Sequence, residues 1–126
     1  MGVIDLERKI NRGDLYYAEL GESNAVGSEQ TGIRPVVVIQ NNIGNEHSPT
    51  VIIAPVTSKT IEKAKLPTHI FLKGYAKRLV KNSLVLLEQM RVIDKTRLTE
   101  KIDYLRYDIM QEIDKKLMLA LGIKNM

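Results

Sequence analysis

Runs of β-branched and aromatic residues, separated by polar stretches rich in glycine and asparagine, dominate the chain up to its C-terminal segment. Such runs are typical of short strands bounded by turns. The predicted strands cover residues 15–20, 33–40, 50–57, 67–72, 83–93 and 100–104. Glu88 and Gln89 interrupt the long run 83–93, so we expect that strand to bend midway. The connections 21–32 and 41–49 are rich in turn residues and predict loops.

The C-terminal segment changes to a helical period. Its apolar residues recur at intervals of four and are Leu105, Ile109, Ile113, Leu117 and Leu121. This spacing predicts an amphipathic helix that packs by one face, and Gly122 is placed to end it. The whole pattern therefore predicts an α+β domain: a small, strongly bent antiparallel β-barrel followed by a C-terminal amphipathic helix.

The stretch 27–41 combines a flexible loop with a rigid strand. Gly27 to Gly32 is small and polar, whereas Val36 to Ile39 is a β-branched run typical of a strand buried on both faces. Pro35 restricts its own backbone and that of Arg34. Arg34 is thus a cation at the boundary of loop and strand, a suitable place to bind a phosphate. The alternative is an arginine that only solvates the sheet edge.

Composition limits the chemistry that this chain can perform. Its 126 residues suit one domain, and a net charge of +4 is compatible with a polyanionic ligand. The absence of cysteine excludes disulfides, thiol nucleophiles and thiolate metal sites. Two histidines, His47 and His69, are too few for a typical zinc site, so we expect no metal and no cofactor. No apolar run has membrane-spanning length and no secretory signal precedes the domain, which predicts a cytoplasmic protein.

Several separated motifs occur together in one order along the chain. They are Arg12-Gly13-Asp14-Leu15-Tyr16, Gly27-Ser28-Glu29-Gln30, Arg34-Pro35-Val36, Ser48-Pro49-Thr50, Thr57, Leu66-Pro67-Thr68-His69 and Leu87-Glu88-Gln89-Met90-Arg91. With these motifs the chain resembles the MazF/PemK family of toxin endoribonucleases. The resemblance covers residues 12–126 as the toxin domain and leaves residues 1–11 as an N-terminal extension, read as a short helix or arm.

The resemblance implies an SH3-like barrel of the PemK/CcdB-like type, a homodimer, and metal-independent cleavage of single-stranded mRNA that arrests translation and growth. It also implies a cognate, MazE-like antitoxin whose acidic C-terminal segment occupies the RNA groove. The similar subgroup suggests a U- and A-containing pentamer such as UACAU as the recognition sequence.

The resemblance assigns roles to particular residues. Arg34 and Thr57 match the catalytic pair of the family, and Glu29 matches a carboxylate on a loop. The residues expected to bind RNA are Ser28, Gln30, Asn41, Lys59, Pro67, Thr68, His69 and Gln89. His69 is equally consistent with a histidine whose ring is hydrogen-bonded inside a strand.

RNA cleavage suits a chain that has no cysteine and no cluster of metal ligands, because the substrate supplies its own nucleophile. The ribose 2′-OH attacks the adjacent phosphorus, expels the 5′-oxygen and leaves a 2′,3′-cyclic phosphate. The reaction needs donors aimed at the charge that grows on the phosphoryl oxygens, which Arg34 and Thr57 supply. An arginine pKa above about 12 makes a poor base, so Glu29 is the better-matched general base.

Two other functions compete with RNA cleavage at this point. One is a non-catalytic, CcdB-like toxin that binds a protein target such as DNA gyrase. The other is a plain RNA-binding module without catalysis.

Overall fold

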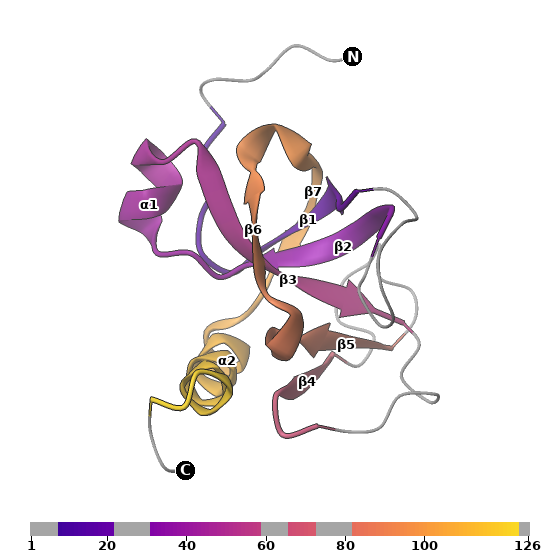
Figure 1. Cartoon of the computed structure of the whole chain (residues 1–126), viewed down its shortest axis with the longest axis vertical. Helices are drawn as coiled ribbons and strands as arrows, with labels where there is room; N and C mark the ends of the chain where they lie inside the picture. Colours follow the sequence, from indigo (N-terminus) through magenta and orange to yellow (C-terminus); the bar gives the residue numbers. More distant parts are fainter. Residues whose placement is uncertain (1–7, 22–30, 59–65, 73–81, 124–126) are drawn as a thin grey trace.

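The computed structural model describes residues 8–21, 31–58, 66–72 and 82–123 (Figure 1). Its strands are β1 (Asp14–Glu19), β2 (Ile33–Val38), β3 (Thr50–Thr57), β4 (His69–Leu72), β5 (Ser83–Leu86), β6 (Arg91–Asp94) and β7 (Leu98–Tyr104). Its helices are α1 (Asn42–His47) and α2 (Tyr107–Ala120), with short 3-10 turns η1 (Leu87–Gln89) and η2 (Lys95–Arg97). The chain is therefore α+β, as the sequence pattern predicted.

All strand pairs are antiparallel and form one seven-stranded sheet in the order β4-β5-β3-β2-β1-β7, with β6 beside β3. β3 is central because it pairs with β2 along one edge, while its other edge is divided between β6 at Thr50–Ile53 and β5 at Val56–Thr57. Among the described residues no pairing joins β7 to β4 or β6. Closure of the sheet into an SH3-like barrel therefore stays a prediction.

Alternate residues of the central strands build two separate cores. Val37, Ala54 and Val56 belong to the core that α2 covers through Ile113. Val36, Val38, Val51 and Ile53 belong to a second core on the opposite face. This division follows from the two-residue period of a strand. The prediction that the run beginning at Val36 is buried on both faces is confirmed, since Val36, Val37 and Val38 are each 0% exposed.

The predicted loop 41–49 contains a helix instead, and capping and packing explain it. The Asn41 side chain accepts a hydrogen bond from the Gly44 backbone N–H at 2.8 Å, which caps the first turn of α1. Asn45 is buried and exchanges hydrogen bonds with Gln40 at 2.9 and 3.2 Å. A Cβ at position 44 would lie only 3.0 Å from the Gln40 side chain, so glycine allows this close packing.

The predicted strand 83–93 is divided into β5 and β6 by η1. This break lies at Glu88 and Gln89, where the polar interruption had predicted a bend. The C-terminal helix is confirmed at Tyr107–Ala120, and Gly122 follows it with φ of +68°, the left-handed conformation common after a helix end.

Residues just before β1 pack on the second core. Ile10 is 7% exposed within it. The Arg8 guanidinium donates to the carbonyls of Leu98 and Lys95 at 3.0 and 3.1 Å and lies over the Tyr16 ring. Residues 8–11 form no helix, and residues 1–7 lie outside the described part of the chain. The division into an extension 1–11 and a domain 12–126 stays a prediction.

Two titratable groups away from the β2–β3 contact have shifted pKa values. Burial raises the pKa of Tyr16, and the nearby Asp14 carboxylate adds to the rise while the Arg8 cation opposes it. Hydrogen bonds from the Thr96 backbone N–H and hydroxyl lower the pKa of Asp94, which caps η2. Tyr16 lies in the second core and Asp94 caps η2, so both groups belong to the structural framework.

No helix in the described part of the chain is long and apolar enough to cross a membrane.

Candidate active site

The strand register brings the predicted catalytic pair together. In the β2–β3 ladder Val36 lies opposite Pro55 and Val38 opposite Ile53. Those pairs end at Val36 and Pro55; continued by two residues, the same register would set Arg34 of β2 opposite Thr57, the last residue of β3. Residues directly opposite each other in antiparallel strands point to the same face, with Cβ atoms about 4.5–5.5 Å apart. The guanidinium and the hydroxyl can therefore reach one phosphate group.

The local structure limits the movement of both side chains. Arg34 is partly buried, lies opposite Ala18 of β1, and donates from Nε to the Thr31 carbonyl at 2.8 Å. Thr57 is 4% exposed. Low local polarity strengthens an interaction between such donors and an anion, and prior ordering removes the cost of reorganising them. The two side chains therefore offer ordered donors that suit an anion.

The face that carries this pair continues across two further strands. Thr57 lies opposite Leu84 of β5, and Leu84 lies opposite Phe71 of β4. His69, two residues before Phe71, shares its face of the strand because side chains alternate along β4. The structure therefore places Arg34, Thr57, His69 and Phe71 on one side of the sheet.

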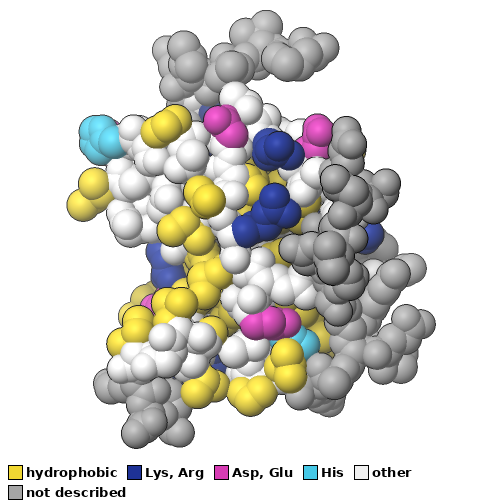
Figure 2. Space-filling view, in the orientation of Figure 1, with side chains coloured by type: hydrophobic (Ala, Val, Ile, Leu, Met, Phe, Trp, Pro, Cys, Tyr) yellow, Lys and Arg dark blue, Asp and Glu magenta, His cyan; other side chains and the backbone are white. Residues whose placement is uncertain are grey.

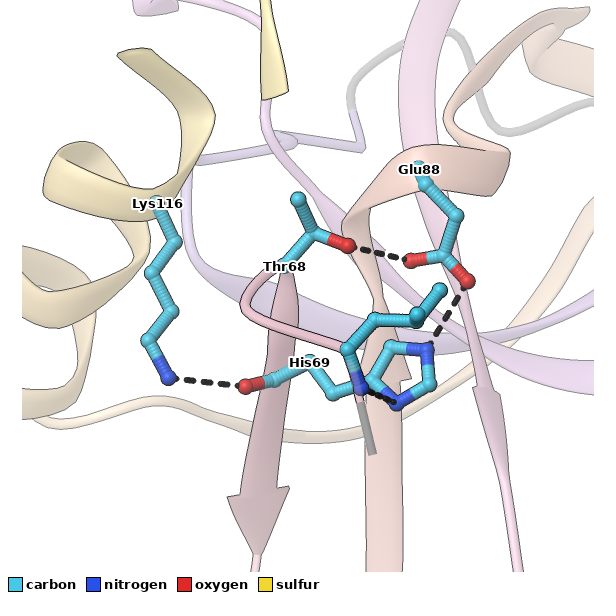
Figure 3. A network of polar contacts seen from close by, with 5 residues as sticks. Thr68, His69, Glu88 and Lys116 are labelled. Carbon is cyan, nitrogen blue, oxygen red and sulfur yellow. Dashed lines mark hydrogen bonds and ion pairs between the residues drawn. The ribbon is translucent and has the colours of Figure 1, made fainter. Parts of the chain in front are cut away.

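A polar network ties this segment to η1 and α2 (Figure 3). The Glu88 carboxylate bonds His69 Nε2 at 2.9 Å through one oxygen and accepts the Thr68 hydroxyl at 2.9 Å through the other. Lys116 of α2 donates to the His69 carbonyl at 2.9 Å and lies 3.4 Å from the Glu112 carboxylate. The start of β4 is thus held from two directions.

The same network determines the state of the His69 ring. The Leu66 backbone N–H donates to Nδ1 at 3.4 Å, which leaves the proton on Nε2 to be donated to Glu88. The His69 side chain is only 5% exposed. This is the geometry of a histidine hydrogen-bonded inside the fold, the alternative to base stacking that the sequence left open. Its predicted role in RNA binding stays a prediction.

Glu88 is the residue that the sequence assignment of the site did not include. The signal was a carboxylate inside an otherwise apolar run, which the sequence shows but cannot interpret. Only the tertiary contact with Thr68 and His69, about twenty residues away in the chain, explains it.

The other predicted RNA-binding residues are distributed unevenly. Pro67 is exposed in the turn before β4, and Gln89 ends η1 beside Glu88, so both lie near the network. Asn41 lies three residues beyond the end of β2 that is far from Arg34, and its side chain caps α1. Ser28, Glu29, Gln30 and Lys59 lie outside the described residues.

Within the described residues no three side chains among His, Cys, Asp and Glu lie close enough together to hold a metal ion.

We expect Glu88→Ala to destabilise the protein by about 1–3 kcal/mol, because it leaves the buried His69 N–H without its acceptor. Glu112→Ala is the matched control, since an exposed i,i+4 pair such as that with Lys116 contributes only about 0.3–0.5 kcal/mol. Urea unfolding of both variants at neutral pH measures the difference. Equal losses would show that the Glu88 contacts contribute no more than a surface ion pair.

Comparison with known proteins agrees with this geometry. The structure is similar to MazF from Deinococcus radiodurans (24% identity, TM-score 0.74, covering 92% of this chain and 99% of that one). It is also similar to MazE–MazF from the same organism (26%, 0.70, 94% and 100%) and to an endoribonuclease in complex with its cognate antitoxin from a mycobacterial species (20%, 0.70, 94% and 98%). The family described as "PemK-like, MazF-like toxin of type II toxin-antitoxin system" matches residues 11–121, and the chain belongs to this family.

Proposed function

We propose that this toxin is a metal-independent endoribonuclease that cleaves single-stranded mRNA at a short sequence and so arrests translation. The observation that carries the proposal is the β2–β3 register, which sets Arg34 opposite Thr57 on one face. Family membership supports it, as does the similarity to a structure that is an endoribonuclease bound to its antitoxin. We also propose that the toxin acts in the cytoplasm, where mRNA is translated.

In the proposed reaction the protein stabilises charge and the RNA provides the nucleophile. The 2′-OH attacks the adjacent phosphorus, the bond to the 5′-oxygen breaks, and the products carry a 2′,3′-cyclic phosphate and a 5′-OH. The Arg34 guanidinium offers donors in a planar fork to the phosphoryl oxygens, and the Thr57 hydroxyl donates to a second oxygen. Glu29 accepts the proton of the 2′-OH, and the leaving 5′-oxygen takes a proton from solvent water as the bond breaks.

We infer that RNA crosses the face from Arg34 toward β4, since the turn at Pro67 and the end of η1 at Gln89 lie on that side. Thr68 and Gln89 supply polar groups there, and Ser28, Gln30, Lys59 and Asn41 are further proposed contacts. The partner that inhibits the toxin is a MazE-like antitoxin, whose acidic C-terminal segment competes for the same basic site. Similar proteins form such complexes.

We further infer a homodimer. Ile52 of β3 and Val92 of β6 lie directly opposite each other and are 39% and 57% exposed. Ile52 shares its face with Ala54 and Val56, so the pair extends the apolar surface of the core beyond the part that α2 covers. Figure 2 shows hydrophobic side chains in a band down this side of the molecule. A second copy of the chain covers this surface in the proposed assembly.

Arg34→Ala and Thr57→Ala should each lower the cleavage rate about 10²–10³-fold, because each removes one preorganised donor. The measurement is cleavage of a long single-stranded transcript in EDTA, with product ends analysed for the cyclic phosphate. Arg106→Ala and Thr99→Ala are the controls, because both residues are exposed on other elements. Intact RNA with the parent protein would favour a non-catalytic, gyrase-binding toxin instead.

Glu29→Gln tests the general base. We expect kcat/KM of the parent to rise with pH through the ionisation of this carboxylate, and the variant to lose that dependence together with most of its rate. Glu19→Gln, at the exposed end of β1, should keep the parent profile. A Glu29→Gln profile identical to that of the parent would assign proton transfer to another group.

Val92→Glu should convert the dimer into monomers, because it introduces a charge into a surface that pairs with its own copy. Sedimentation equilibrium at several protein concentrations measures the change. Thr99→Glu, an exposed substitution on β7, is the matched control. A Val92→Glu protein that remains dimeric would move the interface to another face.

A further inference from the structure

Phe71 is the one phenylalanine of the chain, and the chain has no tryptophan. It is 53% exposed, whereas its neighbours Ile70 and Leu72 are 0% and 1% exposed in the core beneath α2. The alternation of β4 therefore turns Phe71 away from that core and onto the face opposite to it. The packing of β4 in the described part of the chain does not require an aromatic ring there.

The position of Phe71 relative to Arg34 and Thr57 indicates what the ring can contact. The strand register sets Phe71 opposite Leu84, and Leu84 opposite Thr57. Two such steps separate the Cα atoms of Phe71 and Thr57 by about 10 Å. Leu84, the residue between them in the register, is 5% exposed. A nucleotide next to a phosphate held at Thr57 can reach the ring.

Single-stranded RNA binds through two kinds of contact, cations for its phosphates and flat rings for its bases. The row of residues from Arg34 through Thr57 to Phe71 offers both kinds of contact, one after the other across the sheet. Exposure alone does not identify an RNA-binding ring, since Tyr104 and Tyr107 are also exposed, at 62% and 78%. Neither of these tyrosines belongs to the row: Tyr104 ends β7, at the opposite end of the strand order, and Tyr107 begins α2.

We propose that Phe71 stacks on a base adjacent to the scissile phosphate and is a substrate-binding residue of this toxin. The inference rests on the proposed endoribonuclease function and adds a specific contact to it. A phenyl ring has no polar atom to read a base edge, so the contact raises affinity for any base and leaves sequence discrimination to other residues.

The first test uses the absence of tryptophan. Phe71→Trp gives a single indole fluorophore at the site, and a short single-stranded RNA that spans a mapped cut, with a 2′-deoxy substitution at the cut nucleotide, binds without being cleaved. We expect the RNA to quench the indole emission of this variant on stacking. Tyr104→Trp is the matched control and should keep its emission. Equal responses of the two variants would overturn the proposal.

The second test separates binding from chemistry. Phe71→Leu keeps an apolar side chain but removes the flat ring, and should weaken RNA binding about 5- to 150-fold with KM raised to match and kcat unchanged at saturating RNA. Phe71→Tyr should restore the parent affinity. Thermal unfolding of both variants confirms that the fold is retained.

The outcomes distinguish failure of the proposed endoribonuclease function from failure of the proposed stacking contact. A parent protein that neither binds nor cleaves RNA contradicts the proposed function itself. A parent protein that cleaves RNA, with Phe71→Leu equal to it in affinity and KM, contradicts the stacking contact alone. A Phe71→Leu protein with a lower kcat and an unchanged affinity also overturns stacking, because the ring would then act through the structure of the strand.

Discussion

The antiparallel pairing of β2 with β3, buried on both faces, is the constraint on which the rest of this structure depends. Each strand contributes alternate side chains to two cores, so a slip of one residue would move every side chain of that strand from one core into the other and disrupt the packing of both. The same constraint sets Arg34 opposite Thr57 at the end of the ladder. Hydrophobic burial therefore specifies the geometry of a polar site that contributes little to the burial itself.

The surrounding elements maintain this end of the sheet in different ways. β3 divides its outer edge between β6 and β5, which allows the sheet to continue to β4 on the side of the catalytic pair. The Glu88 carboxylate holds Thr68 and His69, and Lys116 links the same segment to α2. These contacts hold the buried His69 from two sides, and in the proposed function they keep the segment 67–69 aligned with Arg34 and Thr57.

This architecture suits a reaction in which the RNA brings the nucleophile. In the proposed reaction the protein holds the scissile phosphate between the Arg34 guanidinium and the Thr57 hydroxyl and aligns the ribose. Glu29, which the sequence places between β1 and β2, adds proton transfer in the proposed mechanism. A sheet face with neighbouring aromatic and apolar positions, such as Phe71 and Leu84, then suits bases rather than phosphates.

The sequence by itself determined most of the strands, the C-terminal helix and the family, because β-branched runs and a four-residue apolar period record local burial and the motifs recur in order. It predicted one strand over 83–93, where the structure has β5 and β6 separated by η1. Through the family resemblance it also proposed Arg34 and Thr57 as the catalytic pair. It did not indicate α1, since the cap by Asn41 and the fit of Gly44 against Gln40 depend on atoms brought together by folding. The contact of Glu88 with His69 and the row that joins Phe71 to Thr57 were likewise decided only by tertiary structure. Periodicity states which face of a strand is buried, whereas the register between distant strands depends on how two cores fill together.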